Sequence, residues 1–278
     1  MQVAEHTIEL AGAPVFYRSA GSSQATSAGE RRATPLFLHG VPTSSDDWLD
    51  LLARSGGLAP DLVGFGRSAK AANLDYTLTG AANFVAQFLD ELGAERVSIV
   101  GNGWGAAAGL LFAQNQPSRV QALVLVNALP LLEGFSWPAP VRTLRRPAIG
   151  ELAMGAITRR RLTKELRSGY ADPARCSETR LQAVWSHFDQ GTQRAVLRLL
   201  RATDSDALAR FGERLDQLTM PALVIAGERD PWLEPSLAEE LARGLNHAEV
   251  SRIPDAGHWP WLEHESVGTR IADFLEAL

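Results

Sequence analysis

The chain has 278 residues, 45% of them hydrophobic, and its 27 Lys and Arg against 32 Asp and Glu give a formal net charge of −5. This length suits one large α/β domain or a domain with an insertion, and the negative charge argues against nucleic acid as a partner. One cysteine, Cys176, excludes an internal disulfide and a cysteine metal cluster, and without a signal-peptide profile or a membrane-length apolar run we expect a cytoplasmic protein that spans no membrane.

Apolar strands and amphipathic helices alternate through the first half of the chain. Residues 7–18 alternate apolar and polar side chains around Gly12, as a hairpin does, and the Ser-, Ala- and Gly-rich residues 19–34 are typical of a loop. The elements predicted next are strands at 35–38 and 58–63, a helix at 79–92, a strand at 96–100, a helix at 104–116 and a strand at 120–126. Solidly apolar strands that alternate with helices indicate a mostly parallel central sheet with helices on both faces.

The alternation of strands and helices stops after the strand predicted at 120–126. Residues 129–218 contain several helical stretches separated by prolines and no convincing strand. The elements predicted beyond them are strands at 222–226 and 248–253 and helices near 235–244 and 265–277. We therefore predict a core formed by residues 1–128 and 219–278 and a helical cap formed by 129–218. A ligand pocket is expected between cap and sheet, because such sheets bind ligands beyond their strand ends.

Five loops, each directly after a predicted strand, hold the residues whose groups are suited to catalysis. They are residues 39–43, 61–68, 101–105, 227–231 and 255–260. Together these loops resemble the α/β-hydrolase superfamily in the chain order nucleophile, acid, histidine, and the resemblance covers nearly the whole chain. The sequence is therefore predicted to adopt the α/β-hydrolase fold with a helical cap insertion.

The resemblance implies a role for each site residue. Asp230 would accept a hydrogen bond from His258, fix its tautomer and stabilise its protonated form, and His258 would take a proton from a hydroxyl or a water. The backbone N–H groups of Val41 and Trp104 would bind negative charge that develops on the substrate. The resemblance implies neither a cofactor nor a metal ion.

Structural alternatives exist for each of these residues. An aspartate after a strand is often only a helix cap, and a histidine between tryptophans can be a packed core residue. The order and loop context of Asp230 and His258 favour the catalytic interpretation of the pair. His39 is expected to serve loop structure. Trp104 is expected to be a pocket wall beside position 103.

The third loop, Gly101-Asn102-Gly103-Trp104-Gly105, resembles the Gly-x-Asp-Trp-Gly turn of haloalkane dehalogenases and epoxide hydrolases. In those enzymes an aspartate attacks carbon to form an ester, and the histidine then activates water to break it. This chain has Gly103 at the nucleophile position. It also has Val41 where many haloalkane dehalogenases have a halide-holding asparagine, and one cap tyrosine, Tyr170, where epoxide hydrolases usually use two.

A glycine at position 103 rules out covalent catalysis through that residue. Three explanations remain open: an engineered inactivation of a small-molecule hydrolase, a natural site where His258 acts as base on a water, or a non-catalytic small-molecule binder. A lyase or isomerase that needs only the His258–Asp230 base is a further alternative.

The sequence gives only the general character of the ligand. An apolar or aromatic small molecule is expected if the tryptophans line the pocket, namely Trp104, Trp137, Trp185, Trp232 and Trp259. Residues 142–167 carry eight Lys and Arg against two Glu, and we expect solvated faces of cap helices there rather than a membrane or anion surface.

Overall fold

The computed structural model describes residues 1–21, 33–133 and 135–278. The described residues form one eight-stranded sheet in the order β1-β2-β4-β3-β5-β6-β7-β8. The strands are β1 (Val3–Leu10), β2 (Ala13–Ala20), β3 (Thr34–Leu38), β4 (Gly57–Pro60), β5 (Val97–Gly103), β6 (Val120–Ala128), β7 (Ala222–Gly227) and β8 (Ala248–Ile253). β1–β2 and β2–β4 pair antiparallel and all other neighbours pair parallel. The predicted mostly parallel sheet is therefore confirmed.

Two sequence predictions at the start of the chain need correction. The hairpin strands are longer than predicted, so Ala20 and Thr34 belong to strands rather than to the loop, while residues 22–32 of that loop lie outside the described residues. The strand predicted at 58–63 ends at Pro60. Beyond Pro60 the chain turns, and the Asp61 carboxylate accepts the backbone N–H groups of Ser45 and of Arg67 in its own loop.

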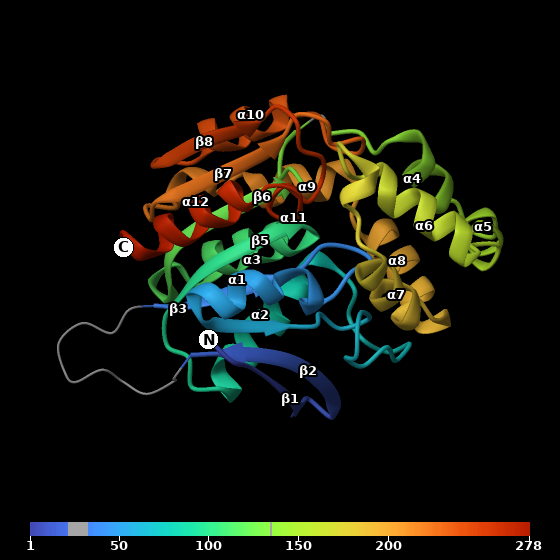
Figure 1. The fold of residues 1–278 in the computed structure, drawn as a ribbon, viewed down its shortest axis with the longest axis horizontal. Helices are drawn as coiled ribbons and strands as arrows, with labels where there is room; N and C mark the ends of the chain where they lie inside the picture. Colours follow the sequence, from blue (N-terminus) through green and yellow to red (C-terminus); the bar gives the residue numbers. More distant parts are fainter. Residues whose placement is uncertain (22–32, 134) are drawn as a thin grey trace.

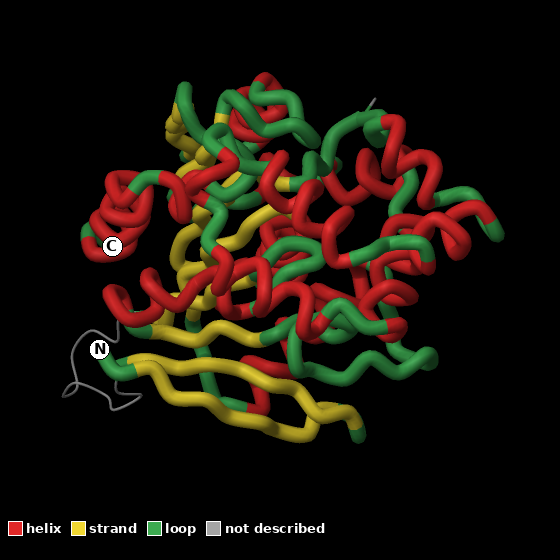
Figure 2. Tube along the Cα trace, turned by 45° about the vertical axis from the view of Figure 1, so that its right-hand side comes forward, coloured by secondary structure: helices red, strands yellow, loops and turns green. Residues whose placement is uncertain are grey.

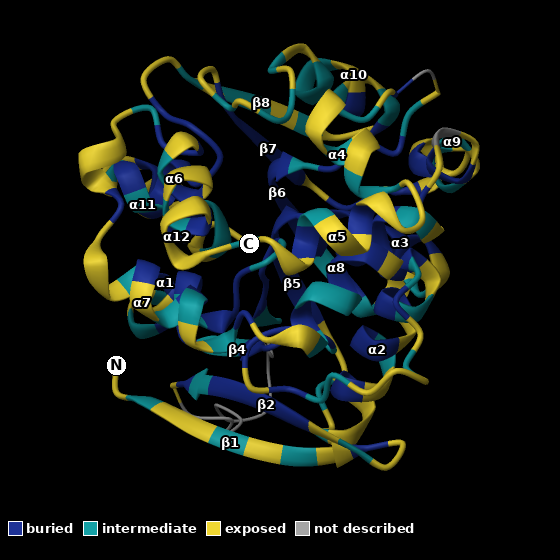
Figure 3. Cartoon of the chain, turned by 90° about the vertical axis from the view of Figure 1, so that its right-hand side faces the viewer, coloured by how far each residue is buried: buried dark blue, intermediate teal, exposed yellow. Residues whose placement is uncertain are grey.

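Helices cover both faces of the sheet. The helices that flank it are α1 (Leu49–Ser55), α2 (Leu78–Glu91), α3 (Trp104–Asn115), α10 (Ser236–Gly244), α11 (Pro260–Glu263) and α12 (Glu265–Glu276). α1 and α12 lie on one face, and α2 and α3 on the other (Figure 3). α1 and α11 were not predicted, because elements of seven and four residues are too short to show a helical period.

Helices alone fill the described part of the chain between β6 and β7, apart from loops and one-turn 3₁₀ segments. They are α4 (Ala139–Leu144), α5 (Ile149–Gly155), α6 (Arg159–Ser168), α7 (Glu178–His187), α8 (Gln190–Ala202) and α9 (Ser205–Gly212). Side-chain caps begin four of them: Thr158, Ser177, Asp189 and Asp204 each accept a backbone N–H of the first turn. Figures 1 and 2 show most of this helical segment beyond one end of the strands.

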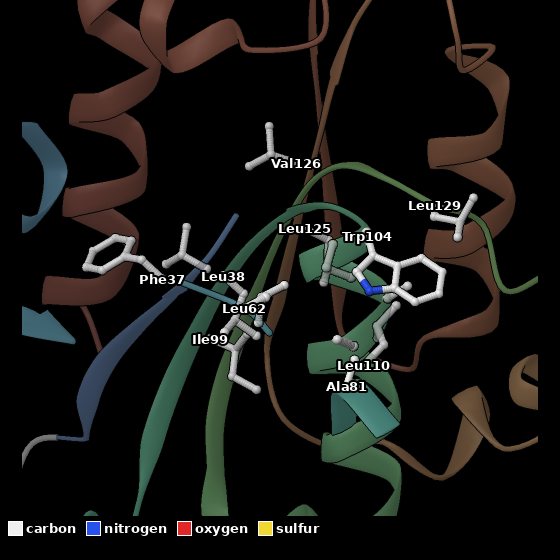
Figure 4. Packing of buried hydrophobic residues seen from close by; sticks show 14 of the residues in the cluster. Phe37, Leu38, Leu62, Ala81, Ile99, Trp104, Leu110, Leu125, Val126 and Leu129 are labelled. Carbon is white, nitrogen blue, oxygen red and sulfur yellow. The ribbon is translucent and has the colours of Figure 1, made fainter. Parts of the chain in front are cut away.

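The hydrophobic core lies between the sheet and its flanking helices. Every residue of β5 is buried, which places its carboxyl end deep in the molecule. Figure 4 shows Leu38 of β3, Ile99 of β5 and Leu125 of β6 in this core, with Trp104 at the start of α3. The strand that carries the glycine-rich turn is thus held rigidly on both sides.

Candidate active site

β5 passes directly into α3 at Gly103, which has φ 52° and ψ −112°. Residues that carry a Cβ rarely adopt these backbone angles. The neighbouring glycines are required for a different reason: a Cβ at Gly101 would lie 2.5 Å from the Cα of Ala106, and one at Gly105 would lie 2.3 Å from the carbonyl oxygen of Leu38. Gly101 and Gly105 therefore allow strand and helix to approach closely, as predicted. At Gly103 backbone conformation, and not space, disfavours a side chain.

His258 and Asp230 face this turn. The His258 Nδ1 atom lies 2.6 Å from Oδ2 of Asp230, whose Oδ1 accepts the backbone N–H of Trp232 at 2.8 Å. The Asp230 side chain is fully buried and that of His258 is 9% exposed. A Cβ built on Gly103 would lie 3.4 Å from Nε2 of His258. The structure thus brings together Gly103, Asp230 and His258, and a proton on Nδ1 leaves Nε2 free to act as a base.

Two asparagines hold the backbone of the His258 loop. Asn102 donates from Nδ2 to the carbonyl oxygen of His258 at 3.2 Å, and Asn127 donates from Nδ2 to that of Gly257 at 2.9 Å. The Oδ1 atom of Asn127 also accepts the N–H of Gly227 at 2.9 Å, so one side chain joins the loops of the acid and of the histidine. The sequence analysis missed Asn127, although its position directly after an apolar strand, at the edge where the other loops meet, pointed to it.

The same loop is fastened to the helical segment by Glu263. This buried carboxylate accepts the N–H of Gly257 at 2.6 Å through Oε1 and that of Ala171 at 2.8 Å through Oε2. The N–H of His258 itself donates to the carbonyl oxygen of Gly169 at 2.6 Å. All four backbone polar groups of Gly257 and His258 are therefore hydrogen-bonded. Two of these bonds, to Gly169 and to Glu263, tie the loop to residues 169–172.

The two backbone N–H groups expected to bind negative charge lie in the loops on either side of the turn. Trp104 is the first residue of α3, so its N–H has no acceptor within the helix. Val41 is half-buried in the loop after β3. No described residue accepts a hydrogen bond from either N–H. Their role in binding an oxyanion stays a prediction.

His39 and Asp61, in the first two predicted loops, make structural contacts. Nε2 of His39 accepts the N–H of Leu62 at 2.9 Å, and the fully buried Asp61 accepts the N–H groups of Ser45 and Arg67 at 2.7 and 2.8 Å. These contacts use the polar atoms of both side chains within the loops. The structural interpretation of His39 fits this geometry.

The five tryptophans expected to line the pocket fall into three groups. Trp232 and Trp259 flank His258 with their rings edge-on to the imidazole, at centroid distances of 4.9 and 5.0 Å. Trp104 lines a small cavity together with Leu62, Ala81 and, from α8 of the helical segment, Leu199; Figure 4 labels the first three. Trp137 and Trp185 line neither this cavity nor the surroundings of His258 in the described contacts. The walls of this cavity are mostly apolar, Asp75 and Thr77 also line it, and Gly103, Asp230 and His258 do not.

A buried ion pair beside the site was not predicted. Arg180 of α7 donates from Nε and Nη2 to the two carboxylate oxygens of Asp47, at 2.8 and 3.1 Å, and its guanidinium lies 4.1 Å from the ring centroid of Trp259. Burial lowers the pKa of Arg180 and the attraction of Asp47 raises it, with a net direction upward. Burial raises the pKa of Tyr170, whose ring also lies against Trp259. Both residues keep their ordinary charge states at neutral pH.

The basic residues of 142–167 lie on α4, in the turn after it and on α6, and several are exposed, among them Arg159, Arg160 and Arg161. Within the described residues, no group of three or more His, Cys, Asp or Glu is arranged to hold a metal ion. No helix in the described ranges is long and apolar enough to cross a membrane.

Comparison with known proteins agrees with this architecture. The model of the alpha/beta hydrolase fold family matches residues 36–265. The chain belongs to the α/β-hydrolase fold family. A haloalkane dehalogenase of Mesorhizobium japonicum is 27% identical over 89% of this chain and 86% of its own. A putative carbamate hydrolase, RutD, of Variovorax paradoxus is 31% identical over 78% of this chain and 80% of its own.

Solved structures show the same fold for this α/β hydrolase. The haloalkane dehalogenase DbeA of Bradyrhizobium elkani superposes with a TM-score of 0.83 at 25% identity, covering 99% of this chain and 98% of that one. The epoxide hydrolase CorEH superposes with a TM-score of 0.81 at 21% identity, over 99% of both chains. The predicted α/β-hydrolase fold is thereby confirmed, and the chain has hydrolases, haloalkane dehalogenases among them, as relatives.

Proposed function

We propose that this α/β hydrolase is a small-molecule hydrolase in which Asp230 and His258 act as a general base on water, with no covalent intermediate at position 103. One observation carries the proposal: Asp230 fixes the imidazole, and its Nε2, to which no described residue bonds, lies 3.4 Å from where a Cβ of residue 103 would be. A water at that place could be deprotonated by His258 without any help from a nucleophilic side chain.

The proposed reaction uses the site as follows. His258 takes a proton from the water, and the hydroxide oxygen bonds to the electrophilic carbon of the substrate. The N–H groups of Val41 and Trp104 bind the oxygen that becomes negative, and the His258 proton then passes to the departing group. The helices of 129–218 serve as the cap, and Trp232 and Trp259, which flank His258, favour a small apolar substrate. The dehalogenases and hydrolases among the relatives support hydrolysis of a small molecule as the reaction class.

Hydrolysis of 4-nitrophenyl acetate tests the proposal. We expect His258→Gln and Asp230→Asn each to lower kcat by roughly 10²–10⁴-fold, the usual contribution of a positioned general base. The matched control is His247→Gln, because this exposed histidine lies directly before β8, at the opposite end of that strand from the loop of His258. Intact-protein mass should show no acyl adduct on the parent chain at any time.

Two other results would contradict the proposal. If the parent binds small apolar molecules but hydrolyses 4-nitrophenyl acetate, 1-bromobutane and styrene oxide no faster than His258→Gln does, the site is a binding module. If His258 instead promotes exchange of carbon-bound hydrogen with deuterated solvent, the base-only lyase or isomerase is the better description.

A further inference from the structure

We propose that the space beside Gly103 binds a free monocarboxylate, with formate as its simplest form, and that this anion supplies the nucleophile that the chain lacks. The proposed function has water as the nucleophile at ester-like carbons. The bound carboxylate extends the same site to alkyl carbons, where displacement needs an anionic nucleophile.

Two independent features point to an anion at this place. α3 is a twelve-residue helix that begins at Trp104, so the positive end of its dipole and its first N–H groups face the turn. His258 has a side chain that is more than nine-tenths buried, and no described group bonds to its Nε2. This nitrogen is aimed at the position where a side chain of residue 103 would begin.

The surroundings favour a carboxylate over other small anions. Formate has the same three heavy atoms as the carboxylate of an aspartate. The nearest atoms to the built Cβ position are Nε2 and Cε1 of His258, at 3.4 and 3.7 Å, and the carbonyl oxygen of Asn127, at 3.9 Å. The two formate oxygens would face Nε2 and the Trp104 N–H, and its C–H would face the Asn127 carbonyl. A spherical halide has no such apolar end to present to that oxygen.

Charge decides which form of His258 holds the anion. The charged partner of His258 among the described residues is Asp230, which contacts its other nitrogen. An anion at Nε2 needs a donated hydrogen there, so formate binds the imidazole that carries a proton on both nitrogens.

The chemical step balances without any further reactant. An oxygen of formate bonds to the alkyl carbon of a haloalkane, the carbon–halogen bond breaks, and the halide leaves with the electron pair. The imidazolium that held the formate then releases its proton to solvent, and His258 deprotonates a water that adds to the formyl carbon of the alkyl formate. The alkoxide leaves and takes that proton, and the formic acid returns its own proton to the imidazole. The sum is haloalkane plus water giving alcohol, halide and a proton, with formate regenerated. This second half-reaction rests on the proposed role of His258; binding does not.

Binding is tested by calorimetric titration of the full chain with sodium formate at constant ionic strength, with sodium chloride as the comparison salt. We expect His258→Gln to weaken formate binding by about tenfold or more, the loss of one charge-assisted hydrogen bond. Gly103→Asp should abolish binding because its own carboxylate fills the site, and Gly103→Ala serves as a second variant if the aspartate does not fold. His247→Gln should bind as the parent does. Absence of formate binding, or equal binding by the parent, Gly103→Asp and His258→Gln, would overturn the proposal.

The nucleophile role is tested with ¹⁸O-labelled formate and 1-bromobutane. If formate attacks, the butanol carries ¹⁸O, because the carbon–oxygen bond formed in the first step survives ester hydrolysis. Butyl formate that accumulates with ¹⁸O supports the inference while contradicting the role of His258 as base in the proposed function. Unlabelled butanol, or no product despite formate binding, would overturn the nucleophile role.

Discussion

Gly103 differs from Gly101 and Gly105 in how much free energy of folding an added side chain would cost. At Gly101 and Gly105 a Cβ would collide with backbone atoms at 2.6 Å or less, so these positions admit nothing else. At Gly103 a Cβ meets its neighbours at 3.4 Å or more, and only the backbone angles oppose it. The penalty for such angles is about 1–3 kcal/mol. Position 103 can therefore be refilled at a tolerable loss of stability.

We predict that Gly103→Asp forms a covalent ester with an alkyl halide and that the ester accumulates when His258→Gln is also present. The introduced carboxylate would lie beside Nε2 of His258, and only an activated water can release the ester. Intact-protein mass after incubation with 1-bromobutane measures the adduct. The free energy of unfolding in urea should fall by about 1–3 kcal/mol.

Gly103→Ala is the control for this variant. It carries the same backbone strain without a nucleophile, so it should lose the same stability and form no adduct. An adduct on neither the aspartate nor the parallel Gly103→Ser variant, tried with haloalkanes, epoxides and esters, would count against a lost nucleophile. Unchanged stability in both Gly103→Ala and Gly103→Asp would show that the turn is not strained.

At the scale of elements, the loop between β8 and α11 is held in place by residues that lie outside the loop. The buried carboxylate of Glu263 accepts N–H groups from Gly257 and from Ala171, and Arg175 donates to its backbone carbonyl oxygen. An acidic residue in a short helix would ordinarily be exposed. Here it joins the loop of His258 to the end of α6.

We predict that Glu263→Gln loosens both segments that the carboxylate joins. The amide keeps one acceptor oxygen but turns an NH₂ group toward a backbone N–H, which leaves a buried donor unpaired at a cost of about 1–3 kcal/mol. Hydrogen exchange followed by mass spectrometry should show faster exchange in residues 255–258 and 169–172. Hydrolysis of 4-nitrophenyl acetate should fall with little change in KM, because the substrate does not touch Glu263.

Glu265→Gln is the matched control for this prediction. Its side chain is 86% exposed and pairs with Arg54 at the surface, so exchange and activity should stay as in the parent. Unchanged exchange in residues 255–258 and 169–172 of Glu263→Gln would show that Glu263 does not position the His258 loop.

At the scale of the whole molecule, the helices between β6 and β7 are joined to the sheet by polar contacts as well as apolar ones. Arg180 on α7 forms a two-point ion pair with Asp47, which precedes α1, and both side chains are at least nine-tenths buried. The indole N–H of Trp261 donates to the carbonyl oxygen of Asp47 at 2.9 Å. Because neither charge reaches water, each depends on the other.

We predict that Arg180→Met lowers the free energy of unfolding by about 3–5 kcal/mol, since it leaves a buried carboxylate without its partner. The double variant Asp47→Leu/Arg180→Met should recover most of this loss, because it removes both charges. Urea unfolding of the two single variants and the double variant gives the coupling energy. Arg54→Met, which breaks the exposed pair with Glu265, should cost only about 0–1 kcal/mol. A double variant no more stable than either single one would contradict this account.

The sequence by itself determined the fold class and the order of the loops. The alternation of apolar strands and helices can be read from local hydrophobic periodicity. This periodicity is a property of each segment and does not depend on how distant segments pack. It also predicted the contact between Asp230 and His258, because loops that follow parallel strands must end at the same edge of the sheet. The bounds of β5 and α3 differ from the prediction by at most three residues at any end.

Only the tertiary structure decided what holds the site in place. Asn127 reaches Gly257 across 130 residues of sequence, and Arg180 reaches Asp47 across 133. No periodicity marks such residues, since each is a single polar side chain whose partner is set by how the sheet and the helical segment pack. By sequence Arg180 and Asp47 are indistinguishable from solvated surface residues, and Asn127 is marked only by its place after the predicted strand 120–126. Burial makes the hydrogen bonds of all three obligatory. The chemistry of the chain lies in its loops, whereas the precision of that chemistry depends on contacts that exist only after folding.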